Sequence, residues 1–276
     1  MGNPSRIDLA FKRLHAEKRA AFIPFFAAGY PDLATTSALI ESSGAAGADI
    51  IEIGVPFSDP IADGPVIQAA FYKALEKGFR VANLFEMVAG LRAGGLETPL
   101  VCMVSYTLVY KQSIQTFMAR CKQAGFDGII IPDLPAGYEG DAAEQAVNAG
   151  LDLVFLIAPT TTPERRELIA GRSRGFVYYI SVTGITGERT ALPADLAANV
   201  KDIQRRTSTP VCVGFGISQA EQARSVGAIA DGVIVGSAIV KRVDEGIAKG
   251  YEGPVLVDYV TDFSKQLAIG THHEKS

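Results

Sequence analysis

Eight apolar runs of strand length alternate with segments of helical periodicity, and this pattern predicts a (β/α)₈ barrel. The runs are apolar throughout, as in parallel strands covered on both faces. A glycine precedes an aspartate just before four of the runs, at 47–49, 125–127, 150–152 and 227–231, which indicates a repeated unit of helix, glycine stop and buried strand. No linker of Gly, Ser and Pro divides the chain, so we expect a single domain over 1–276. A doubly wound open sheet is the main alternative.

The expected elements follow one another along the chain. Strands are expected near 22–26, 48–53, 99–104, 127–131, 152–157, 176–180, 210–214 and 232–235. Helices are expected near 35–46, 82–93, 113–123, 139–149, 163–170, 194–206, 218–226 and 238–248. Three additional helices are expected. One lies near 5–17, in an N-terminal segment that covers 1–20, and the others lie near 65–76 and 254–268. A polar tail is expected at 270–276.

Composition excludes several classes of partner. The net charge of −4 and the pI near 5.5 give no basic surface for nucleic acid or anionic membranes. No apolar run approaches the roughly 20 residues of a membrane span, and the N-terminus has no signal-peptide core. We therefore expect a cytoplasmic protein.

Cysteine and histidine are not arranged as metal ligands. The cysteines are scattered without a CxxC pair, and the histidines lie only near the two ends of the chain. These residues are Cys102, Cys121, Cys212, His15, His272 and His273. Neither a metal site nor a disulfide framework is expected.

The segment IEIGVPFSDPIADGPVIQ, 51–68, carries the most information about chemistry. Glu52 lies within an apolar strand, and Asp59 and Asp63 follow in a loop rich in Gly and Pro. Carboxylates at a strand end, among apolar residues, are suited to acid/base catalysis. A structural reading also exists: a strand Glu can be a salt-bridge partner, and Asp beside Pro can form turns.

The other unusual motifs also follow expected strands, where barrels of this kind place their active sites. GFGIS and VGSA follow the last two strands, and SVTGITGERTALP follows the sixth. Their glycines let backbone N–H groups approach an anion, and Ser218 or Ser237 could cap a helix that faces it. The glycines are Gly184, Gly187, Gly214, Gly216 and Gly236. We expect a phosphate site, although these residues could merely form turns.

Taken together, the 51–68 motif, PDLP, YISVTGITG, GFGIS and VGSAIV closely resemble the tryptophan synthase alpha chain family over roughly 20–268. The resemblance implies a barrel that cleaves indole-3-glycerol phosphate to indole and glyceraldehyde 3-phosphate in tryptophan biosynthesis. It also implies a heterotetramer with a beta chain that carries pyridoxal phosphate, with no cofactor in this chain. By motif match Glu52 and Asp63 are catalytic and Tyr178 is a site residue. The match assigns Gly187, Gly216, Gly236 and Ser237 to the phosphate cradle.

The chemistry also follows from the residue types. Cleaving the carbon–carbon bond at indole C3 needs an electron sink, and protonating C3 makes the indole ring that sink. No Schiff-base lysine is then required. Glu52, in an apolar strand, should have a raised pKa and move the proton. Asp63, on a loop, should stay ionised and hold the indole N–H.

The remaining candidates have less defined roles. Apolar side chains could line an indole pocket or simply fill the barrel; these are Phe25, Ile67, Phe215 and Val235. Asp133 is expected to anchor a loop or to contact the ligand. Asp59 is expected to have a structural or partner-contact role. The loop 182–193 is expected to close over ligand, bringing Thr186 toward Asp63, and Arg189 there is a trypsin site.

One segment departs from the family. After the third expected strand the family commonly has a Tyr-Asn-Pro-like segment that contacts the beta chain, whereas this chain has VSYTLV at 104–109. The carboxylates are unaffected by this change. Two other functions stay open at this point: another phosphate-binding barrel enzyme, such as a sugar-phosphate epimerase, or a non-catalytic partner that only activates a beta chain.

Overall fold

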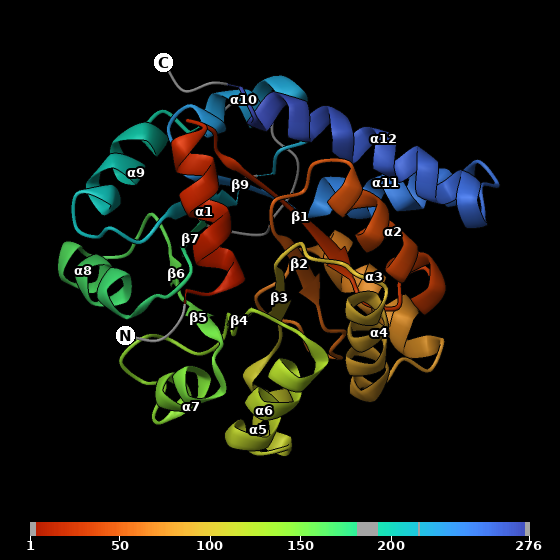
Figure 1. Ribbon diagram of the computed structural model, residues 1–276, viewed down its shortest axis with the longest axis horizontal. Helices are drawn as coiled ribbons and strands as arrows, with labels where there is room; N and C mark the ends of the chain where they lie inside the picture. The colour runs from red at the N-terminus through yellow and green to blue at the C-terminus, as the bar shows by residue number, and fades with distance from the viewer. Residues whose placement is uncertain (1–3, 181–192, 215, 274–276) are drawn as a thin grey trace.

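The computed structural model describes residues 4–180, 193–214 and 216–273, and its strands form one parallel sheet that is nearly closed into a barrel (Figure 1). The order of strands in the sheet is β5-β4-β3-β2-β1-β9-β8-β7-β6. The strands are β1 (Ala21–Ala27), β2 (Ile51–Gly54), β3 (Leu100–Met103), β4 (Gly128–Ile130), β5 (Asp152–Val154), β6 (Leu156–Ile157), β7 (Val177–Ile180), β8 (Val211–Gly214) and β9 (Gly232–Val235). The predicted barrel is confirmed.

The predicted strand at 152–157 closes the barrel in two short pieces. Its first half, β5, pairs with β4, and its second half, β6, pairs with β7. Phe155 lies between the halves, and its carbonyl oxygen accepts a hydrogen bond of 3.0 Å from the Tyr178 N–H. Because one expected strand is divided in two, the eight expected strands correspond to the nine strands of the described chain.

Helices surround the barrel in Figure 1, and all the expected ones are present. They are α1 (Arg6–Ala16), α2 (Leu33–Ala45), α3 (Pro65–Glu76), α4 (Val81–Ala93), α5 (Tyr106–Lys111), α6 (Ile114–Ala124), α7 (Ala142–Ala149), α8 (Pro163–Arg172), α9 (Leu196–Gln204), α10 (Ala220–Gly227), α11 (Ser237–Ala248) and α12 (Gly253–Thr271). The short helix α5 was not predicted. Among the described residues, no helix is long and apolar enough to cross a membrane.

Alternation along the strands decides which side chains enter the barrel. Phe25 of β1 is in register with Glu52 of β2, and Leu156 of β6 is in register with Tyr178 of β7. Partners in a parallel pair point to the same face of the sheet. These four side chains therefore share the barrel interior near the carboxyl ends of the strands.

The amino end of the barrel is closed by α1. Ile7, Phe11 and Leu14 of this helix are buried in one apolar cluster with Val101 and Phe176 of the barrel interior. The ring centroids of Phe11 and Phe176 lie 6.2 Å apart. In Figure 1 this helix lies across the ring of strands. Because α1 covers one end, a ligand can enter the barrel only from the carboxyl end.

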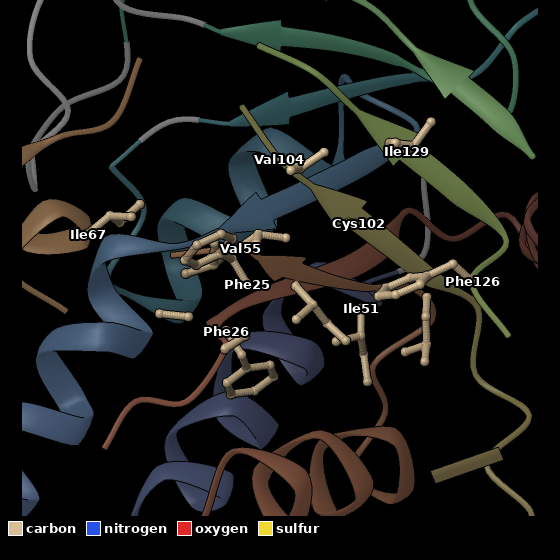
Figure 2. Close-up of a cluster of buried hydrophobic side chains, with 14 of the residues drawn as sticks. Phe25, Phe26, Ile51, Val55, Ile67, Cys102, Val104, Phe126 and Ile129 are labelled. Carbon is tan, nitrogen blue, oxygen red and sulfur yellow. The ribbon is translucent and has the colours of Figure 1, made fainter. Parts of the chain in front are cut away.

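A second apolar layer lies between the barrel and its helices. Figure 2 shows part of it, with Phe26, Ile51 and Cys102 from neighbouring strands packed with Phe126. Cys102 and Cys212 are both buried, as the apolar runs around them predicted. This layer holds the helices in place, and with them the loops at the carboxyl ends of the strands.

The repeated aspartates before the strands have a structural function. The carboxylate of Asp49 accepts the Phe22 N–H at 3.0 Å, that of Asp127 accepts the Leu100 N–H at 2.9 Å, and Asp231 accepts the Val211 N–H at 2.9 Å. Each aspartate thus satisfies a backbone donor at the start of the neighbouring strand. The motif that predicted the repeat also joins adjacent strands.

We expect Asp127→Ala to lower the free energy of unfolding by about 3 kcal/mol. Asp127 is 2% exposed and pairs with Arg92 at 2.7 Å and Arg6 at 3.1 Å, so its removal leaves the partly buried Arg92 without its counter-charge and the Leu100 N–H without its acceptor. Urea denaturation measures the change. Glu97→Ala is the control, because the exposed Glu97 only pairs with Arg6 at 3.5 Å. Equal losses in the two variants would contradict this explanation.

Candidate active site

A cavity of about 270 Å³ opens at the carboxyl ends of the strands. It is lined by Glu52 of β2, Asp63 of the loop that follows, and Tyr178 of β7. Apolar side chains and glycines form the rest of the described wall: Phe25, Ala62, Ile67, Met103, Ile130, Pro132, Leu156, Ile180, Gly214, Gly216, Ile217, Ile234 and Gly236, with Ser237 beside them. A mostly apolar cavity with a few polar groups is typical of a small-molecule site.

Glu52 is the most deeply buried of the polar groups. It is 1% exposed, and its Oε2 atom has no hydrogen-bond partner among the described residues. Burial, with a smaller contribution from the charge of Asp63, raises the pKa of Glu52 to about 8. The predicted direction of this shift is therefore confirmed. At neutral pH the side chain is mostly protonated and can donate a proton into the cavity.

The ionisation of Asp63 differs from the expectation that this carboxyl stays ionised. Burial, followed by the charge of Asp133, raises the pKa of Asp63 to about 7, so this carboxyl is not fully ionised at neutral pH in the empty site. The loop position suggested solvent exposure, but the loop folds over the cavity and Asp63 is half-buried.

Tyr178 reaches the cavity because the adjacent strand, β8, has a glycine at position 214. A Cβ atom at Gly214 would lie 2.6 Å from the Tyr178 hydroxyl, which is closer than atoms pack. Burial, together with the charges of Glu52 and Asp63, raises the pKa of Tyr178 well above its ordinary value. The hydroxyl therefore stays protonated beside the two carboxyls, while the neighbouring Tyr179 is part of the core.

The part of the wall that follows β9 has features of an anion site. Helix α11 begins at Ser237, and its N-cap residue is Gly236, which has no side chain to cap the first turn. Uncapped N–H groups at a helix N-terminus favour an anion. Helix α10 is different, because Gln219 and Gln222 form its capping box and the Ser218 N–H donates to Gln222. Neither Ser218 nor Ser237 is the helix cap that we expected, because the N-cap residues are Gln219 and Gly236.

The structure brings most of the other predicted residues to the cavity. Phe25 and Ile67 line it, whereas Val235 is buried in the layer between the barrel and the helices, and its neighbour Ile234 faces the cavity instead. Predictions on Thr186, Gly187 and Phe215, and on Gly184 and Arg189, fall outside the described residues.

Sequence reasoning missed several lining residues. They are Met103, Ile130, Leu156 and Ile180, which come from four different strands. Each has the same strand parity as Glu52 or Tyr178, so the alternation of the strands carried the signal. The alternation could not be read without the register, because most strands have apolar residues on both faces.

Two further aspartates lie beside the cavity. Asp133 accepts hydrogen bonds of 2.8 Å from the Ser105 hydroxyl and from the Tyr106 N–H, so it anchors the start of α5. Asp59 is exposed on the loop that carries Asp63, and its carboxylate accepts a hydrogen bond of 2.6 Å from the adjacent Ser58 hydroxyl. Within the described chain, no cluster of three or more His, Cys, Asp or Glu could hold a metal ion.

A barrel closed at one end has, at the other, a buried acid, a second carboxyl and an uncapped helix N-terminus, which are the groups that acid/base chemistry on a phosphorylated compound requires. The family model for "Tryptophan synthase alpha chain" matches residues 11–261. The chain belongs to the tryptophan synthase alpha chain family, whose members cleave indole-3-glycerol phosphate. It is therefore an enzyme subunit with lyase function.

Individual relatives agree with this family. The tryptophan synthase alpha chain of Rhodopirellula baltica is 44% identical over 241 residues, which is 87% of each chain. That of Thermoanaerobacter sp. is 42% identical, with 95% of this chain and 98% of the relative covered. Among solved structures, Mycobacterium tuberculosis tryptophan synthase has a TM-score of 0.89 at 34% identity, covering 98% of this chain and 100% of that one.

Glu52→Gln should stabilise the fold increasingly as the pH rises. A carboxyl whose pKa is raised from 4.5 unfolded to about 8 folded costs stability progressively across that interval, because the folded state resists ionisation. Between pH 5 and pH 9 the advantage of the variant over wild type should grow by about 2 to 4 kcal/mol.

Urea denaturation at the two pH values measures this change. Glu86→Gln, at an exposed position on α4, is the matched control and should show no such growth. An advantage of Glu52→Gln that is equal at pH 5 and pH 9 would contradict the assigned burial of this carboxyl.

Proposed function

We propose that this cavity binds indole-3-glycerol phosphate, with Glu52 and Asp63 as the catalytic groups of the retro-aldol cleavage. The observation that carries the proposal is the buried Glu52 Oε2 atom, which lacks a partner among the described residues and belongs to an apolar cavity. A buried polar atom without a partner is costly, and in a cavity a bound ligand can explain why it is kept. Substrate would supply the missing interaction.

Glu52 performs two proton transfers in this scheme. Its protonated carboxyl first donates a proton to indole C3, which interrupts the ring's conjugation and leaves the ring positively charged. The resulting carboxylate then takes the proton from the side-chain hydroxyl next to the bond that breaks. The electrons of that bond return to the ring, giving indole and an aldehyde, and Glu52 is again protonated. A pKa near 8 suits a group that must act first as acid and then as base.

Asp63 acts on the ring nitrogen. In its ionised form it accepts a hydrogen bond from the indole N–H and stabilises the positive charge that follows protonation of C3. The ionised fraction of Asp63 grows above pH 7 and the protonated fraction of Glu52 falls above pH 8. Cleavage by the free enzyme should therefore be fastest between these values.

The phosphate is held by the part of the cavity wall that follows β8 and β9. We assign it to the N-terminus of α11, with Gly236 and Ser237, and to Gly216. The apolar wall between the carboxyls and this cradle, including Phe25 and Ile67, accommodates the indole ring. Tyr178, beside Glu52, orients the side-chain hydroxyl of the substrate.

Glu52→Gln should reduce indole formation by about 10²-fold or more, because it keeps the shape but removes the transferable proton. Indole release from indole-3-glycerol phosphate is measured directly, and binding of glycerol 3-phosphate is measured by calorimetry and should persist. Glu86→Gln is the control. Indole release near the wild-type rate in Glu52→Gln would remove Glu52 from the mechanism. Loss of phosphate-ligand binding as well would indicate a damaged site instead.

We also propose a cytoplasmic location and assembly with a tryptophan synthase beta chain, which would carry the pyridoxal phosphate and consume the indole. Membership of the alpha chain family supports the partner. The carboxyl-end loops are the suggested docking surface, since Ile61 and Tyr110 there are 85% and 70% exposed. The chain itself is proposed to need no cofactor, because the protonated ring is its electron sink.

Asp59 is the residue that we expect to transmit docking to Asp63, four positions along the same loop. Asp59→Ala should leave the slow cleavage by the isolated chain unchanged and lower the stimulation by a beta chain several-fold. Steady-state cleavage is compared with and without the beta chain, and Glu86→Gln again serves as control. Equal stimulation of both variants would remove Asp59 from the coupling, and no stimulation of wild type would remove the partner.

A further inference from the structure

Asp133 shares a second, small cavity with Asp63. This cavity, of about 20 Å³, adjoins the active site and has Asp63, Asp133, Ser105 and Met103 in its wall. Its size is sufficient for about one water molecule. It lies between the loops that follow β2, β3 and β4, so these loops meet beside the second catalytic carboxyl.

We infer that Asp133 is a positioning residue for the cleavage reaction, whose fixed negative charge controls the protonation of Asp63 across this small cavity. The inference rests on the proposed catalytic role of Asp63. Asp133 acts through Asp63 and is not assigned any contact with substrate.

Two hydrogen bonds fix the charge of Asp133 in place. Its Oδ2 atom accepts from the Ser105 hydroxyl and its Oδ1 atom accepts from the Tyr106 N–H, both at 2.8 Å. Both donors come from the segment that enters α5, so the carboxylate is held by a different loop from its own. A carboxylate with both oxygens engaged cannot turn away from its neighbours without losing these bonds.

Among the ionisable groups around Asp63, Asp133 is the one whose negative charge acts on the Asp63 carboxyl. Glu52 and Tyr178 face Asp63 from β2 and β7, and both are mainly protonated at neutral pH. Asp59 lies on the same loop but is exposed to solvent, which screens its charge. Neither cavity is lined by a Lys or Arg within 4–180, 193–214 and 216–273. After burial, the charge of Asp133 is the cause that raises the pKa of Asp63.

The chemical consequence concerns the strength of Asp63 as an acceptor. A carboxylate with a higher proton affinity accepts a stronger hydrogen bond from the indole N–H as the ring becomes positive. The same shift lowers the ionised fraction of Asp63 at pH 6 to 7. Asp133 therefore favours catalysis above neutral pH at the expense of activity below it.

Asp133→Asn tests the inference because it removes the charge and can keep both bonds, with the amide oxygen accepting from Tyr106 and the amide nitrogen donating to Ser105. The acid limb of the pH profile of kcat/KM should move to lower pH by roughly 0.5 to 1 unit. The ratio of kcat/KM at pH 6 to that at pH 7.5 should rise roughly twofold to fourfold, a comparison that is insensitive to a uniform loss of activity.

Ser105→Ala is the matched control, since it removes one hydrogen bond to Asp133 but no charge, and its acid limb should not move. An unmoved limb in Asp133→Asn, or an equal shift in both variants, would overturn the inference. Should Asp133→Asn fail to give a cooperative melt, Asp133→Ser, whose hydroxyl can still accept from Tyr106, takes the same test.

Asp63→Asn separates this inference from the proposed function. Loss of cleavage in Asp63→Asn with an unmoved limb in Asp133→Asn would refute only the role of Asp133. Wild-type cleavage in Asp63→Asn would refute the role of Asp63, and the inference would fall with it.

Discussion

The candidate active site depends on a carboxylic acid buried inside an otherwise apolar barrel. Register places Glu52 level with Phe25, and strand alternation turns both side chains inward. At that depth the charged form of Glu52 is disfavoured, so the fold itself keeps the acid protonated at neutral pH. The apolar wall around Glu52, which we propose accommodates the indole ring, also excludes the water that would solvate a charge.

Buried acids have cationic partners at the amino end of the barrel but not in the described cavity at its carboxyl end. At the amino end, Asp49 accepts the Phe22 N–H and pairs with Arg13 at 2.7 Å, and Asp127 is bound by two arginines. At the carboxyl end, Glu52 has an atom without a described partner, and Lys and Arg are absent from the described cavity wall. Compensated acids stabilise the strands, whereas the uncompensated acid costs stability and supplies reactivity. Closing the amino end with α1 leaves the reactive end as the entrance.

Much of this arrangement could be predicted from the sequence, for identifiable reasons. The apolar runs and glycine stops located every strand, and the 51–68 motif located Glu52 and Asp63. Three features escaped prediction because they depend on tertiary contacts. Helix α5 has a cap from Asp133, 27 residues away from Tyr106. Only the strand register shows that Ile234, and not Val235, faces the cavity. The raised pKa of Asp63 requires a loop folded over the cavity, which local sequence does not reveal.

The central claim is that Glu52 carries a proton at neutral pH, and infrared difference spectroscopy of wild type minus Glu52→Gln tests it directly. The carbonyl stretch of a protonated carboxylic acid is separate from the bands of a carboxylate, so the difference spectrum reports the state of this one side chain. We predict that the protonated band is present at pH 7 and disappears with a midpoint near pH 8. A band that has already disappeared at pH 7, with a midpoint near the ordinary glutamate value, would contradict the claim.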